Sequence, residues 1–156
     1  MMMKTFLMIK PDGYKYRKEI IDHLKSKNLK IEKIKEVKVN MDVMQILLKH
    51  YEEVIDRMGK DFNFPGKLFN SFYFDNQYIV PMIVSSNSDN IIEKTRRLVG
   101  ATNPKEAKLN TLRYLYSDDD YEKADLENRL VNNVIHASDS IESAKREIEL
   151  WETIFK

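Results

Sequence analysis

The sequence contains no cysteine and no long apolar run. Without cysteine the chain can form neither a disulfide nor a thiolate zinc site, which fits a reducing compartment and leads us to expect a cytoplasmic protein. The first apolar run, from Thr5 to Ile9, stops at the sequence "PDG" and is too short to cross a membrane. We therefore expect neither a membrane protein nor a secreted one. A Walker-type glycine loop is also missing, which excludes a P-loop enzyme.

An excess of charge of one sign is missing as well. The chain has 26 basic and 25 acidic side chains, giving a net charge of +1. This balance argues against nucleic acid as the main partner, because binding to a polyanion requires clustered positive charge. A hydrophobic share of 42% within 156 residues allows one ordinary hydrophobic core. Since no repeat or linker divides the chain, we expect a single domain over residues 1–156.

Hydrophobic periodicity predicts an alternation of strands and helices. The expected strands are 5–9, 34–40, 78–84 and 132–136, and the expected helices are 19–27, 43–55, 67–73, 90–100 and 140–149. Residues 101–131 show no clear periodicity. Within them "SDDDYEKADLEN", residues 117–128, is polar and acidic and is expected to form a long surface loop, with or without one helical turn. The element order predicts an α+β fold, an α/β sandwich with an antiparallel sheet covered by helices on one face.

Some single residues give local predictions within these elements. Asp42 is expected to cap the helix that follows it. Pro81 lacks a backbone donor, so its strand is expected at a sheet edge or at a bulge. In the last helix, Ile141, Ala144 and Ile148 are expected to line the buried face.

The stretch "VNNVIHASDS", residues 131–140, places His136 between an apolar run and residues that cap helices. A strand end followed by a helix N-terminus is a rigid mount with free N–H groups that favour an anion. Glu147 lies one to two turns into the helix, on the flank of its apolar stripe, where it could reach one imidazole nitrogen. These residues alone leave two interpretations open: a catalytic histidine, or a boundary histidine beside a capped helix. His23 and His50 are interpreted as ordinary helix residues.

Cationic residues occur at positions suited to phosphate binding. Lys10 ends the first strand, and a charged side chain at the end of a buried strand needs a partner, either a phosphate or an internal carboxylate. Arg96 and Arg97 lie late in a helix, and Arg113 lies in the irregular segment.

Four segments together resemble the nucleoside diphosphate kinase family: "TFLMIKPDG", "RRLVGATNPKEA", "NTLR" and "NNVIHASDSIESAKREIELW". The resemblance runs from residue 5 to about 151, and the histidine segment is its most specific part. It implies a ferredoxin-like sheet and a ping-pong reaction through a phosphohistidine on His136. The γ-phosphate of a nucleoside triphosphate, mainly ATP, would pass to a nucleoside diphosphate. The resemblance also implies magnesium carried by the nucleotide and a homo-oligomer, either a tetramer or a hexamer.

The resemblance also implies a role for individual residues. Lys10 matches the lysine near the transferring phosphate, and Tyr51 matches the tyrosine on the helix beside it. Ser138 and Glu147 match the side chains that support the histidine. The positions that match nucleotide contacts are Arg96, Thr102 and Arg113 for the phosphates, Asn133 for the sugar, Phe64 in preference to Phe62 for the base, and Asp139 for magnesium through water.

Several positions depart from the family pattern without removing a catalytic side chain. The Gly-Asp that commonly follows the arginine is absent after Arg113, and Ala137 replaces a common glycine. The stretch 114–132 is longer than usual and acidic. We therefore expect altered loops and subunit contacts with unaltered chemistry. A catalytically silent nucleotide-binding module is the alternative, but it would have no chemical reason to keep His136, Lys10 and Glu147 together.

Overall fold

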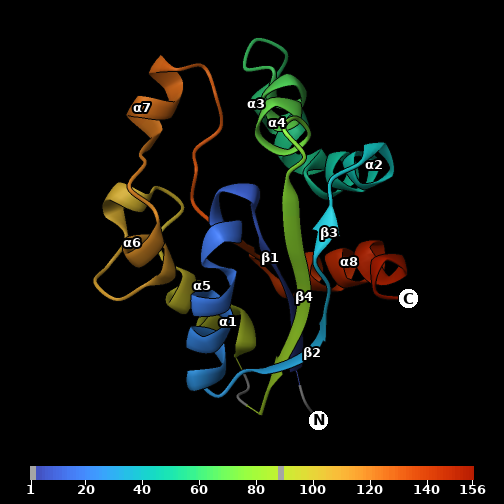
Figure 1. Ribbon diagram of the computed structural model, residues 1–156, viewed down its shortest axis with the longest axis vertical. Coiled ribbons are helices and arrows are strands. Elements are labelled where there is room, and N and C mark those ends of the chain that lie inside the picture. The colour runs from blue at the N-terminus through green and yellow to red at the C-terminus, as the bar shows by residue number, and fades with distance from the viewer. Residues whose placement is uncertain (1–2, 88–89) are drawn as a thin grey trace.

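A computed structural model describes residues 3–87 and 90–156, and its centre is a five-stranded sheet (Figure 1). The strands are β1 (Met3–Ile9), β2 (Lys30–Ile34), β3 (Val37–Lys38), β4 (Tyr78–Ser86) and β5 (Ile135–Ala137). They run in the order β2-β4-β1-β5, with β3 also paired to β4, and every pair is antiparallel. This sheet and its helices confirm the predicted α+β class.

Helices cover both faces of the sheet, whereas the sequence analysis expected one covered face. They are α1 (Arg17–Ser26), α2 (Met41–His50), α3 (Glu52–Met58), α4 (Phe64–Phe72), α5 (Ile91–Val99), α6 (Leu112–Tyr116), α7 (Tyr121–Leu126) and α8 (Ile141–Trp151). Leu7 and Ile9 pack with α1 and α5, while Phe6 and Met8 pack with α2, α4 and α8. The unbroken apolar run of β1 requires this arrangement, because alternate side chains of a strand point to opposite faces.

The strand that contains Pro81 was predicted at a sheet edge or at a bulge, and the edge position was wrong. β4 is central, and Pro81 pairs with Met8 of β1. On its other side the Pro81 carbonyl accepts a hydrogen bond from the Lys35 N–H, 3.2 Å away, between the end of β2 and the start of β3. Since the N and C=O of one strand residue point to the same side, the missing donor faces this break in the neighbouring strand.

Helix boundaries also differ from the predictions. Asn40 rather than Asp42 caps α2, because its Oδ1 accepts from the Val43 N–H at 2.9 Å. The single helix expected at 43–55 is divided into α2 and α3 at Tyr51. The strand expected at 34–40 begins earlier, at Lys30, and is interrupted after Ile34.

The largest error concerns residues 101–131, which were expected to form a surface loop with at most one helical turn. They contain a short 3₁₀ turn, Pro104–Glu106, and the helices α6 and α7. Leu112 and Arg113 are buried within this segment, as is Asp119. In α8, Ile141 is about half exposed, and the buried face carries Ala144, Glu147 and Trp151. Within the described residues, no helix is long and apolar enough to span a membrane.

Candidate active site

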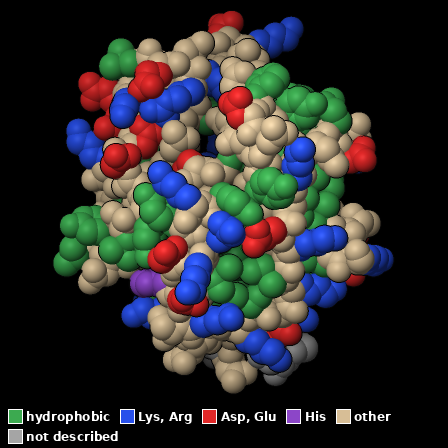
Figure 2. Space-filling model, in the orientation of Figure 1, with side chains coloured by type: hydrophobic (Ala, Val, Ile, Leu, Met, Phe, Trp, Pro, Cys, Tyr) green, Lys and Arg blue, Asp and Glu red, His purple; other side chains and the backbone are tan. Residues whose placement is uncertain are grey.

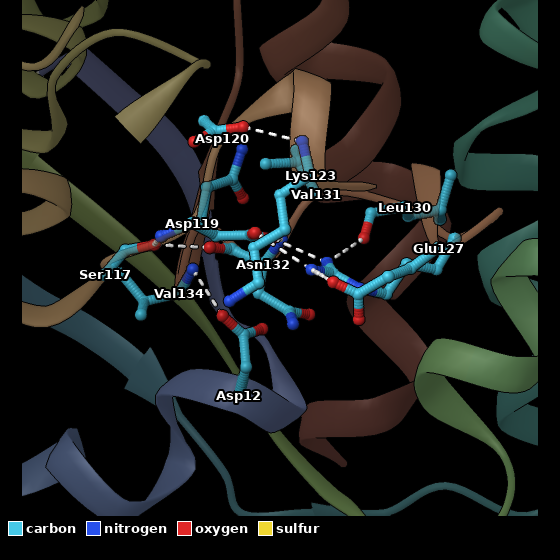
Figure 3. Close-up of polar contacts among 12 residues, drawn as sticks. Asp12, Ser117, Asp119, Asp120, Lys123, Glu127, Leu130, Val131, Asn132 and Val134 are labelled. Carbon is cyan, nitrogen blue, oxygen red and sulfur yellow. Dashed lines mark hydrogen bonds and ion pairs between the residues drawn. The ribbon is translucent and has the colours of Figure 1, made fainter. Parts of the chain in front are cut away.

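The turn after β1 is joined directly to the chain that leads into β5. The Lys10 N–H donates to the Val134 carbonyl at 2.8 Å. The Asp12 carboxylate accepts from the Val134 N–H at 2.9 Å, and Figure 3 shows this second contact. A Cβ on Gly13 would lie 2.4 Å from the Val134 carbonyl oxygen. The sequence "PDG" therefore provides an acceptor and a residue without a side chain where two backbones meet.

His136 is held from one side by α8. Its Nε2 lies 2.8 Å from Glu147 Oε1, and the Ser138 hydroxyl donates to the same oxygen at 2.7 Å. Glu147 is 4% exposed and Ser138 is completely buried. Because the carboxylate accepts from Nε2–H, the neutral imidazole has its lone pair on Nδ1. The sequence analysis could not distinguish the two nitrogens. It placed Glu147 on the flank of the apolar face of the last helix, whereas Glu147 lies on the buried face itself, with Ala144 and Trp151.

Lys10 is bound to a neutral amide. Its Nζ donates to Asn133 Oδ1 at 2.8 Å and to the Val131 carbonyl at 3.4 Å, and Asn133 Nδ2 donates to the Thr102 carbonyl at 3.0 Å. No ion pair to Lys10 occurs among the described residues. Burial lowers the pKa of the ammonium to about 8, with Asp12 as the main opposing charge. The internal carboxylate that the sequence analysis offered as one partner of Lys10 is therefore not found among residues 3–87 and 90–156.

Arg113 is buried and donates three hydrogen bonds to backbone carbonyls. Its guanidinium contacts the oxygens of Asn133 at 3.1 Å, Ile135 at 2.6 Å and Gly100 at 3.0 Å. Burial, followed by the nearby charge of Arg96, lowers its pKa to about 10. Arg113 thus links the end of α5 to the strand that carries the histidine, while Arg96 remains exposed and donates to the Ala137 carbonyl at 3.4 Å.

His50 is a site residue that the sequence analysis missed. Its ring centroid lies 4.4 Å from that of His136, at 78° to it. Its Nδ1 accepts from the Trp151 Nε1–H at 3.0 Å, and its buried Nε2 has no partner among the described residues. Burial, followed by the charges of His136 and Arg146, lowers the His50 pKa well below its ordinary value. The available sequence signal was its place next to Tyr51.

These side chains face one cleft of about 610 Å³. The polar end contains Lys10 and His136, and the aromatic end contains Phe62 and Phe64, whose rings lie 6.2 Å apart. Ten of the predicted site residues line the cleft: Lys10, Tyr51, Phe64, Arg96, Thr102, Arg113, Asn133, His136, Asp139 and Glu147. Ser138 lies behind Glu147 and contacts the site only through it.

Two sets of residues were considered as metal ligands. Ligand atoms of His50, His136 and Glu147 lie within 4.8 Å of one another. Two hydrogen bonds already occupy Glu147 Oε1, however, and a pair of imidazoles does not suit magnesium. Asp139 is exposed beside the histidine in the cleft wall, and its carboxylate is the type of ligand that magnesium approaches through water.

Comparisons with known proteins identify the family. The family model for nucleoside diphosphate kinase matches residues 3–154. The chain belongs to the nucleoside diphosphate kinase family. It is 39% identical over 152 residues to a nucleoside diphosphate kinase of Saccharolobus islandicus, covering 96% of this chain and 94% of that one. A nucleoside diphosphate kinase of Streptococcus pneumoniae is 35% identical, over 96% of this chain and 99% of the relative.

Solved structures of nucleoside diphosphate kinases share the fold. The enzyme of Borrelia burgdorferi, solved as a transition-state mimic with bound vanadate and ADP, superposes with a TM-score of 0.82 at 27% identity, covering 96% of this chain and 86% of that chain. The enzyme of Pyrobaculum aerophilum gives a TM-score of 0.75 at 31% identity, covering 97% and 96%. These comparisons confirm the resemblance found in the sequence and the ferredoxin-like fold. They also confirm the enzyme class, a kinase of nucleotide metabolism.

Proposed function

We propose that this nucleoside diphosphate kinase transfers the γ-phosphoryl group through His136 Nδ1, with ATP as the main donor. The supporting observation is the contact between His136 Nε2 and Glu147, which leaves the Nδ1 lone pair free. This lone pair attacks the γ-phosphorus, the bond to the β–γ bridging oxygen breaks, and the nucleoside diphosphate leaves. A second nucleoside diphosphate then attacks the phosphohistidine and restores the imidazole.

The cations at the polar end of the cleft stabilise the transition state. Negative charge spreads over the phosphoryl oxygens during transfer, and positioned charges lower the barrier more effectively than mobile water does. Lys10 supplies a desolvated ammonium whose hydrogen-bond partners are neutral. Arg96 is exposed in the cleft wall, and Arg113 is already fixed by three carbonyls. In this proposal Arg96 adjusts to the phosphates, while Arg113 contributes a fixed positive charge.

The remaining residues bind and orient the nucleotide. Tyr51 keeps its hydroxyl proton, because burial and then the charge of Glu147 raise its pKa, so it serves as a donor near the phosphates. Thr102 adds a contact to the phosphates and Asn133 to the sugar. Phe64, with Phe62 beside it, provides the aromatic face on which the base stacks.

Magnesium enters with the nucleotide in this proposal. When bound, it neutralises part of the charge on the phosphate oxygens. Asp139 fits a contact through water, because its exposed carboxylate faces the cleft beside the histidine. Its role is to orient the hydrated ion.

Acid-labile labelling tests the phosphohistidine. The protein incubated with magnesium and γ-labelled ATP should take up label that acid removes and alkali leaves, because a phosphoramidate is labile in acid. Any nucleoside diphosphate should then discharge the label as the corresponding triphosphate. The variant His136→Asn should remain folded and take up no label. His23→Asn, on α1, is the matched control and should label normally.

Two outcomes would contradict this proposal. Label that persists in His136→Asn would assign the phosphoryl group to another residue, with Ser138 and Ser140 as the neighbouring hydroxyls. Wild-type protein that binds ATP and takes up no label would identify a silent nucleotide-binding module.

We further propose that residues 1–156 act as one cytoplasmic domain within a homo-oligomer, a tetramer or a hexamer. Support comes from Leu109, Tyr114 and Leu115 near α6, which are 70%, 49% and 44% exposed. Figure 2 shows hydrophobic side chains gathered over this part of the molecule, and apolar patches of this kind commonly contact another chain. Light scattering that reports a monomer at micromolar concentration would contradict the oligomer.

A further inference from the structure

The helix α7 forms one wall of the nucleotide cleft. It belongs to the stretch that is longer here than in the family pattern. Tyr121, Ala124 and Asp125 all line the cleft, and their spacing places them on one face of the helix. Figure 1 shows α7 across from α3 and α4, which carry the aromatic end of the cleft. A base lying against Phe64 would therefore have α7 opposite it.

The position of α7 is fixed at its base by a network of hydrogen bonds. The Asp119 carboxylate accepts from Arg129 through both oxygens, at 2.6 and 2.9 Å, and from the Asn132 N–H at 2.7 Å. The Ser117 hydroxyl donates to the Asn132 carbonyl, and Asp120 caps the helix by accepting from the Lys123 N–H at 2.7 Å. Figure 3 shows these groups converging on Asp119. The chain before α7 is thus joined to the chain after it, which sets the position of the helix beside the cleft.

Asp125 is the unusual residue of this wall. Its side chain lines a cleft whose deep end carries Lys10, Arg96 and Arg113, yet it forms no hydrogen bond or ion pair with the described residues. Arg129, the other charged residue of this wall, forms an ion pair with Asp119. A free carboxylate repels the phosphates of a nucleotide. Apart from a hydrated metal ion, the groups of a nucleotide that complement it are the base N–H groups and the ribose hydroxyls, which are hydrogen-bond donors.

We propose that Asp125 is a nucleotide-binding residue that accepts hydrogen bonds from the nucleoside part of the substrate, opposite the aromatic face at Phe64. The proposal rests on the proposed function, since it places a nucleotide in this cleft. The extra length of the stretch 114–132 would then contribute a contact to the nucleotide bound by the same chain. Guanine is the base with the best match, because its adjacent N–H groups can bind both oxygens of one carboxylate.

Equilibrium binding of GDP to Asp125→Ala and Glu122→Ala tests this assignment. Glu122 lies on the same helix and is exposed, as Asp125 is, but it does not line the cleft, so its variant removes the same charge without the contact. Loss of a negative charge alone tightens polyanion binding slightly. We therefore expect Glu122→Ala to bind GDP as well as wild type or better, and Asp125→Ala to bind about tenfold more weakly. An affinity of Asp125→Ala equal to or above that of Glu122→Ala would overturn the proposal.

Further ligands separate the two sources of donors. A larger loss for GDP than for ADP assigns the contact to the base, and a loss for GDP that is absent with 2′-deoxy-GDP assigns it to the ribose. Inorganic triphosphate has no nucleoside, so its affinity should not fall in Asp125→Ala, and an equal fall would contradict the contact. Because binding is measured without turnover, acid-labile labelling of the same samples reports separately on the proposed reaction.

Discussion

Glu147 Oε1 accepts hydrogen bonds from His136 Nε2 at 2.8 Å and from the Ser138 hydroxyl at 2.7 Å. One buried carboxylate oxygen therefore fixes the ring that carries the proposed nucleophile and is itself fixed by a buried hydroxyl. This arrangement selects the tautomer with a free Nδ1 and prevents rotation of the imidazole.

Replacing Glu147 by glutamine should slow phosphorylation with little effect on folding. The amide can still accept from Ser138, but it no longer provides the negative charge that favours a proton on Nε2. We expect the rate of label uptake to fall about a hundredfold, as measured by rapid quench. Glu149→Gln, exposed on the same helix, is the control and should react normally. A rate within a factor of two of wild type would show that the carboxylate does not position the histidine.

The pKa of Lys10 predicts an alkaline limit of activity. The amine loses its proton as the pH rises through about 8, and with it the charge that stabilises the transferring phosphate. Values of kcat/KM should therefore fall above pH 8, since this ratio reports the pKa values of the free enzyme. Lys10→Arg should be slower at pH 7 and should lack this decline. A decline that persists unchanged in Lys10→Arg would assign it to another group.

His50 should make the protein less stable in mild acid. Its folded pKa lies below the unfolded value of about 6.5, so the unfolded chain binds more protons and stability is lost as the pH falls below 6.5. Urea unfolding at pH 7, 6 and 5 should show a steeper loss of the unfolding free energy in wild type than in His50→Gln. The half-buried His23 has a pKa lowered less strongly, so His23→Gln should change this slope less.

The contact between Asp119 and Arg129 should stabilise the fold. Burial raises the Asp119 pKa, but hydrogen bonds from Arg129 and from the N–H groups of Asn132 and Asp120 outweigh it and lower the pKa to about 2. The stabilisation is complete above the unfolded value near 3.9 and is lost as the pH falls through about 2. At pH 7, Asp119→Asn should lower the unfolding free energy by about 2 kcal/mol. Asp118→Asn, at an exposed neighbour, should have no measurable effect.

Short-range sequence patterns predicted the helices and strands that depend on neighbouring residues alone. The apolar run of β1, the Ser140 cap of α8 and the histidine between them were all readable, because short-range patterns determine strands and helix starts. The helix α6 was missed and α7 was expected at most as one helical turn, since their positions depend on Arg113 reaching carbonyls up to 22 residues away and on the pairing of Asp119 with Arg129. The periodicity of apolar residues along the chain does not reveal contacts between residues distant in sequence.

The same limit applies to the site. The position of Lys10 was predictable from the end of its strand, but its neutral partner Asn133 lies 123 residues further along the chain. His50 looked like an ordinary helix residue, because its contact with Trp151 spans 101 residues. Sequence therefore indicated the residue types of the site, and the fold determined which of them meet.

The joining of the "PDG" turn to Val134 has a consequence for the order of folding. Lys10 and Asp12 are synthesised before their partners at Val131, Asn133 and Val134, which follow more than a hundred residues later. Contacts so distant in sequence carry a large loop-closure entropy, and they cannot form before both partners have been synthesised. The site is therefore complete only once β5 has paired with β1, because a nascent chain that ends before Val131 lacks both His136 and the partners of Lys10.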